Sequence, residues 1–177
     1  EQMRELFKAS IDAKKFAELP IFNKEPIRTA VPANIYEDFT ICNLKVSEVG
    51  CGAICTLQVI SSYYERSDME KICNAIESNG YYYPGRGLWW HWFDKLGCRR
   101  ITHWYDICTA IYSENVVTVL VKYPNRERGL FMNILGVKNK REGDYIETAN
   151  QLIFLTNEGE ITLEDLAKYI STAPYMW

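Results

Sequence analysis

The sequence of 177 residues lacks the apolar runs and leader patterns that mark membrane-inserted or exported chains. No run approaches the roughly 20 apolar residues that a membrane-spanning helix needs. The N-terminus, Glu-Gln-Met-Arg, also lacks the charged-then-apolar order of a signal peptide. Because the chain begins at Glu1 rather than Met, an export signal could already have been removed. We therefore expect no integral membrane segment.

Clustered positive charge is missing as well. The chain has 20 Lys and Arg against 23 Asp and Glu, a net charge of -3, and its basic residues are scattered. Such a chain has no field that would gather phosphate groups or anionic lipid. Nucleic acid is therefore not an expected partner. The hydrophobic content of 47% and charged content of 24% are those of an ordinary soluble domain.

Zinc-ligand spacing is absent too. Zinc sites need close pairs of Cys or His, but the sequence has no Cys-x-x-Cys, and its two histidines, His91 and His103, stand alone. Neither a metal nor another cofactor is expected. Four of the six cysteines lie in or beside apolar-periodic segments, where a thiol behaves as a small buried hydrophobe: Cys55, Cys73, Cys98 and Cys108. This slightly favours a reducing, cytoplasmic compartment, with secretion or a surface location as the alternative if a signal was removed.

The N-terminal part of the chain has apolar residues at the spacing of helices. Residues 1–18 predict a mostly polar helix that is ended by Pro20, and an extended segment is expected within 36–46. Apolar residues then repeat at helical spacing over 51–64 and again in a helix that Ser67 and Asp68 can cap and that Asn79-Gly80 stops.

A short helix over 105–112 is followed by a change of period. Four β-branched or aromatic runs with turn residues between them predict an antiparallel meander of strands: 116–123, 131–137, 145–148 and 152–156. A last helix follows, capped by Thr162. Helices first and strands later predict an α+β fold, with a helical arm over residues 1–20 and a single domain over 21–177.

Aromatic residues make up 14% of the chain and are densest in one segment, 81–93, a Pro/Gly loop that enters a short helix ending near Gly97. One interpretation is that these rings line a groove for an extended peptide or a glycan, because rigid amphipathic rings supply contact area at low entropic cost. The other is that they fill space between the helical half and the sheet.

The turn Gly50-Cys51-Gly52 directly precedes an apolar helix. A cysteine in the first turn of a helix can become a nucleophile, because the positive helix end and its backbone N–H groups stabilise a thiolate and can hold an oxyanion. It still needs a base that is oriented by a third group. The alternative is structural: small residues stand where strand, turn and helix crowd together.

The wider sequence resembles the papain-like cysteine peptidases, in particular the double-glycine leader peptidases that process bacteriocins. Residues 48–64 resemble the nucleophile helix of that family, 83–97 its Gly-rich loop and short helix, and 106–122 the helix and strand before its histidine motif. The resemblance covers about residues 40 to 155. It implies a papain-like fold in which an N-terminal helical half, with the Cys51 helix, packs on a C-terminal antiparallel sheet.

The sequence departs from the family at the residues that would assist Cys51. Where the family has Gly-His-Phe, this chain has Gly129-Leu130-Phe131, so the histidine position holds Leu130. Asn150 falls on the family's orienting aspartate, a role that an amide can fill. The oxyanion glutamine before the cysteine has no counterpart, since the nearby polar residues are Asn43, Lys45 and Glu48.

These features leave three hypotheses. The first is a degenerate papain-like domain, a pseudopeptidase that binds a peptide or protein partner in its cleft without efficient cleavage, because a leucine cannot accept the thiol proton. The second is an active, divergent cysteine peptidase, amidase or acyltransferase in which Cys51 works with an unrecognised base. The third is a structural module of a larger or surface assembly. The candidate substrate-binding residues are Gly52, Gly87, Trp89 and Trp90; the oligomeric state stays open.

Overall fold

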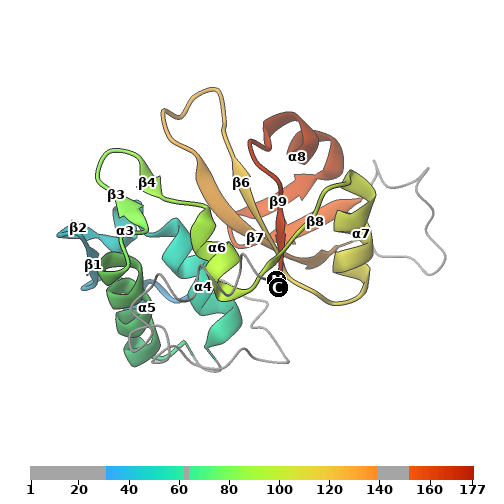
Figure 1. Cartoon of the computed structure of the whole chain (residues 1–177). Helices are drawn as coiled ribbons and strands as arrows, with labels where there is room; N and C mark the ends of the chain where they lie inside the picture. Colours follow the sequence, from blue (N-terminus) through green and yellow to red (C-terminus); the bar gives the residue numbers. More distant parts are fainter. Residues whose placement is uncertain (1–30, 62–63, 139–151) are drawn as a thin grey trace. The chain divides into compact units, whose positions relative to one another are not determined.

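The computed structural model describes residues 31–61, 64–138 and 152–177 (Figure 1). They form two compact units, Val31–Cys98 and Arg99–Trp177. The first is mainly helical and the second is built on an antiparallel sheet, so the predicted α+β class is confirmed. The expected arm over residues 1–20 and the expected strand 145–148 lie outside the described residues. A single domain over 21–177 stays a prediction.

The first unit begins with a small hairpin instead of the one extended segment expected within 36–46. Its strands are β1 (Thr40–Ile41) and β2 (Leu44–Lys45), which pair antiparallel. The two residues between them, Cys42 and Asn43, have φ angles of 50° and 65°. Two successive residues in the left-handed region form a type I′ turn, which reverses the chain between twisted strands.

Helices make up most of the first unit, and a second hairpin separates the last two. In chain order its other elements are η1 (Ala33–Ile35, before the hairpin), α3 (Val46–Val49), α4 (Cys51–Ile60), α5 (Arg66–Ser78), β3 (Tyr82–Tyr83), β4 (Gly87–Leu88) and α6 (His91–Leu96).

Local chemistry explains where these helices end. Helix α5 stops at Asn79 and Gly80, whose φ is 70°, and α6 stops at Gly97, whose φ is 91°, as predicted. Helix α4 ends four residues earlier than expected because Ser61 is extended and its Oγ accepts a hydrogen bond from the Glu65 amide. Glu65 is also the residue that precedes α5, so Ser67 and Asp68 lie inside that helix and do not cap it.

The second unit contains one sheet and two helices. Its elements are β5 (Arg99–Arg100), α7 (Trp104–Tyr112), β6 (Val117–Val121), β7 (Leu130–Val137), β8 (Ile153–Thr156), β9 (Gly159–Thr162), α8 (Leu163–Tyr169) and β10 (Tyr175–Met176). The strands lie side by side in the order β5-β10-β6-β7-β8-β9, and every pair is antiparallel. Thr162 caps α8 as predicted, its Oγ1 accepting from the Asp165 amide at 3.2 Å.

The hydrophobic core of the second unit lies on one face of this sheet. Alternate residues of β7, which are Leu130, Met132 and Ile134, contact it together with the side chains of α7 and α8. The partners of these residues across the ladder, Val121, Val119 and Val117, belong to the same core. A register shift at Leu135 separates the pairs that β7 makes with β8. In the described part of the chain, no helix has the length and hydropathy needed to cross a membrane.

Candidate functional site

Cys51 is the first residue of α4, directly after Gly50. Its side chain is half-buried. The helix runs for 10 residues with no acidic side chain in its first turn, so the partial positive charge of its N-terminus is not offset there by its own residues. The sequence thus predicted correctly that Cys51 lies in the first turn of a helix, while its role as a nucleophile stays a prediction.

The glycines on both sides of Cys51 have packing reasons of their own. A Cβ on Gly50 would lie 2.7 Å from the carbonyl oxygen of Val46, a backbone atom that cannot move aside. A Cβ on Gly52 would lie 2.1 Å from Cδ2 of Leu88, so the Leu88 side chain occupies that space. The structural interpretation of the Gly-Cys-Gly turn therefore holds for both glycines and leaves the thiol itself unexplained.

A buried hydrogen-bond chain fixes the first turns of α4. Thr56 Oγ1 donates to the Gly52 carbonyl at 2.8 Å and accepts from Trp92 Nε1 at 3.0 Å. Thr56 and Trp92 are both fully buried. Since Trp92 lies in α6, this chain ties the turn that carries Cys51 to the aromatic segment, a link that the sequence does not reveal.

The aromatic segment forms a layered cluster. The Tyr81 ring meets Trp89 at 5.9 Å and Trp92 at 5.7 Å between centroids, and the Trp89 amide donates to the Tyr81 carbonyl. Burial, with a smaller contribution from Asp94, raises the pKa of Tyr81 to about 12. Trp89 and Trp90 are half-buried, and Tyr83 is 49% exposed. The segment thus has an inner part that fills space and an outer part that presents rings to solvent.

The predicted binding residues divide between these parts. Trp89 and Trp90 keep exposed ring surface, and Gly87 is half-exposed with a φ of 95° that few other residues adopt. Gly52 is buried under Leu88. Among the described residues of this unit, the Trp pair is therefore the better candidate for ligand contact, and Gly52 serves packing.

His91 is a titratable group within this cluster. Its Nδ1 lies 3.0 Å from Oδ2 of Asp94, one helical turn later. The ring stacks on Trp90 at 3.7 Å between centroids and meets Trp89 edge-on at 4.3 Å. An imidazole oriented by a carboxylate is the base and orienter half of a thiol-based site. The His-x-x-Asp spacing at the start of a helix was a signal that the sequence reading missed.

Leu130 is the first residue of β7, in the second unit. It is half-buried and packs against the hydrophobic core of that unit, opposite Val121. Leu130 therefore serves core packing in this chain, and its equivalence to the histidine of the resembling family stays a prediction. Asn150 lies outside the described residues, so its predicted role stays a prediction.

The other polar residues considered in the sequence are solvent-facing. Asn43, Lys45 and Glu48 are all exposed, in the β1–β2 turn, in β2 and in α3. His103 precedes α7 and is exposed. None of the four is buried among groups that would give it a defined chemical task.

Two buried polar residues of the second unit, Asn133 and Thr118, went unpredicted. Asn133 is fully buried on β7, and its Oδ1 accepts from Thr118 Oγ1 at 2.6 Å. Thr118 Oγ1 in turn accepts from Trp177 Nε1, also at 2.6 Å. Asn133 interrupts an otherwise apolar strand, which was the available signal, and through Thr118 it is linked to Trp177, the residue that follows β10.

None of the six cysteines forms a disulfide bond. Within the described ranges, no three His, Cys, Asp or Glu side chains are grouped so that they could hold a metal ion. Comparison of the chain with protein-family models, with curated proteins and with solved structures gives no match. The papain-like resemblance therefore depends on the residues of this chain alone.

Proposed function

We propose that this chain is a degenerate papain-like peptidase domain, a pseudopeptidase that binds a peptide or protein segment without cleaving it efficiently. The observation that carries the proposal is the side chain at position 130. Leu130 has no proton acceptor, and its contacts with the core of the second unit give it a structural use. Loss of a general base removes about 10²–10⁴-fold of rate.

Retained features support binding in the absence of turnover. Cys51 keeps its place at the start of α4, and Tyr83, Trp89 and Trp90 keep ring surface open to solvent in the same unit. Flat aromatic rings that are held by other rings bind with little loss of side-chain entropy. An extended peptide can use such a surface whether or not the thiol reacts.

The test separates binding from cleavage. A defined library of unstructured decapeptides is passed over immobilised full chain, and retained peptides are sequenced by mass spectrometry before and after a long incubation. We expect retention without new peptide ends, unchanged in Cys51→Ala and reduced several-fold in Trp90→Ala. New ends that appear with the wild-type chain and vanish with Cys51→Ala would refute the proposal.

A second candidate function follows from the His91–Asp94 pair. Leu88 contacts Gly52 and Trp92 is bonded to Thr56, so the residues on both sides of His91 are held against α4. In a divergent acyltransferase or amidase, His91 would take the Cys51 proton, the thiolate would attack an amide carbonyl to form a thioester, and the departing amine would receive that proton. Water or another amine would then release the acyl group.

Thiol alkylation distinguishes this candidate from the first. The rate at which iodoacetamide modifies Cys51 is measured between pH 5 and 10, beside an unstructured cysteine peptide. A base provided by His91 predicts a rate that exceeds the peptide's near neutral pH and falls at least about tenfold in His91→Gln and in Asp94→Asn, but not in His103→Gln. Equal rates in all of these variants would exclude it and leave the pseudopeptidase.

A further inference from the structure

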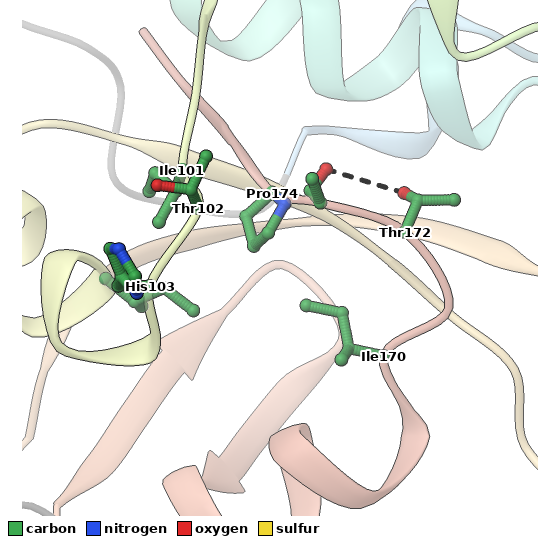
Figure 2. Close-up of a pocket in the computed structure, with 8 residues that line it drawn as sticks. Ile101, Thr102, His103, Ile170, Thr172 and Pro174 are labelled. Carbon is green, nitrogen blue, oxygen red and sulfur yellow. Dashed lines mark hydrogen bonds between the residues drawn. The ribbon is translucent and has the colours of Figure 1, made fainter.

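The second unit contains an apolar pocket of about 340 Å³. Figure 2 shows Ile101 and His103 on one side of it, Ile170 and Thr172 on the other, and Pro174 between them. The lining side chains are apolar or carry no formal charge at pH 7, so they select no class of ligand and no site is proposed there. Chemistry that does support an inference lies in the first unit, at the end of α5.

Asn79 and Gly80 form the single Asn-Gly pair of the chain, directly after α5. An asparagine followed by glycine is prone to deamidation, because glycine has no side chain to keep its nitrogen away from the asparagine amide carbon. The Gly80 nitrogen bonds to Asn79 Cγ and releases its proton to water, while the Cγ–Nδ2 bond breaks and ammonia leaves. Water then opens the resulting succinimide at either carbonyl, which gives aspartate or isoaspartate.

The fold keeps the two reacting groups apart. Asn79 Nδ2 donates to the Ala75 carbonyl at 2.7 Å, and the Gly80 amide donates to the Glu77 carbonyl at 3.1 Å. The Asn79 ψ of 2° turns the Gly80 nitrogen toward the Asn79 backbone nitrogen, whereas ring closure needs it beside the Asn79 side chain. Asn79 is half-exposed and Gly80 is exposed, so water reaches the pair. Deamidation therefore requires the last turn of α5 to open.

Tyr81 links this pair to the aromatic cluster. Its amide donates to the Ile76 carbonyl at 3.0 Å, across the end of α5. Its buried ring contacts Trp89 and Trp92. Isoaspartate at position 79 would add one atom to the main chain between α5 and this ring. It would also place a negative charge at a helix C-terminus, where the helix dipole disfavours it.

We propose that Asn79-Gly80 is a spontaneous deamidation site that the last turn of α5 gates, and that the isoaspartate product loosens the packing of Tyr81 on Trp89 and Trp92. The reaction needs water alone as co-reactant. This modification site goes beyond the proposed function, because it involves neither Cys51 nor Leu130 and would exist even if that function were wrong.

Deamidation rates test the gate. Mass spectrometry follows the full chain at pH 8 beside an acetylated, amidated peptide of residues 76–82. We expect the full chain to react at least about tenfold more slowly than the peptide, because hydrogen bonds must open first. The ratio of the two rates should match the hydrogen-exchange protection of the Gly80 amide within about threefold, since both reactions need the same opening. Equal rates, or a ratio outside that range, would overturn the gate.

Two exposed serines at opposite ends of α5 supply matched variants. Ser78→Gly weakens the last turn and removes the hydrogen bond from Ser78 Oγ to the Asn74 carbonyl. It should speed deamidation several-fold, relative to a peptide with the same change. Ser67→Gly, at the first turn of the helix, should not. Equal rates in the two variants would contradict control by the last turn.

The purified isoaspartate chain tests the effect on the aromatic cluster. We expect weaker near-UV circular dichroism and faster exchange of the Tyr81 amide than in Asn79→Asp, which carries the charge on a normal backbone. The same two measurements on the unmodified chain give the reference. An isoaspartate chain that cannot be distinguished from the unmodified chain would overturn the proposed loosening of Tyr81.

Discussion

Replacing Thr56 by valine should destabilise the first unit through one buried hydrogen-bond donor. Valine keeps the shape of threonine but has no hydroxyl to accept from Trp92 Nε1 or to donate to the Gly52 carbonyl. The Gly52 carbonyl keeps its helical acceptor position. The indole N–H of Trp92 is fully buried and has no such substitute.

The expected cost follows from that N–H group. A buried donor that loses its partner costs about 1–3 kcal/mol, so we expect the free energy of unfolding to fall by about 2 kcal/mol in Thr56→Val. Thr56→Ser keeps both hydrogen bonds and removes only a methyl group, which costs about 1 kcal/mol. With a urea dependence of about 2 kcal/mol per molar, Thr56→Val should move the midpoint down by about 1 M.

Urea titrations followed by tryptophan fluorescence measure both variants, and Trp92→Phe completes a double-mutant cycle. In the Trp92→Phe background no indole N–H remains, so Thr56→Val should cost at least about 1 kcal/mol less there. Equal costs in both backgrounds, or a Thr56→Val midpoint within error of Thr56→Ser, would refute the reasoning that the Thr56–Trp92 bond holds α4 to α6.

Three other substitutions have expected outcomes. Burial lowers the pKa of Lys95 from 10.5 to about 8. Below pH 8 the folded and unfolded states both bind the Lys95 proton, and the buried charge lowers the free energy of unfolding. This cost is lost as the pH rises from about 8 toward 10, because the folded state then releases the proton while the unfolded state still binds it. Lys95→Met should therefore stabilise the chain at pH 7, by on the order of 1–3 kcal/mol. In urea titrations this gain should be smaller at pH 10. A gain that does not change with pH would contradict a lowered pKa of Lys95 as its cause. Leu130→His should lower the free energy of unfolding by about 1–2 kcal/mol through lost core packing and should raise the iodoacetamide rate of Cys51 near neutral pH by restoring a base. An unchanged rate would count against the proposal that Leu130 stands at the histidine position of a papain-like site. Thr162→Ala should cost about 1 kcal/mol by removing the α8 cap, and Thr162→Ser, which keeps the hydroxyl, should cost clearly less.

Helix ends and the order of the main elements were predictable because they depend on residues close in sequence. Glycine at Gly80 and Gly97 relieves a left-handed backbone, and Thr162 reaches an amide three residues away. The strands β5 and β10 were not predictable. Each has two residues, too few to show a period, and they form only because they pair with each other and because β10 pairs with β6.

The candidate site likewise has a part that the sequence could predict and a part that it could not. The place of Cys51 at a helix start could be inferred from Gly50, Gly52 and the apolar period that follows. The support from Trp92 through Thr56 could not, because these residues are 36 positions apart and meet only through packing. The contact of Leu130 with the core was hidden for the same reason, since alternation along β7 does not say which face is covered by α7 and α8.

The strand order β5-β10-β6 also has a consequence for synthesis of the protein. Residues 99–100 leave the ribosome about 75 positions before the strand that attaches them to the sheet. At synthesis rates of about 5–20 residues per second, β5 waits several seconds for β10, while β6 to β9 can already pair. During that interval the edge of β6 that β10 will cover is open to other extended chains, so this edge is where a nascent chain is most exposed to misassembly.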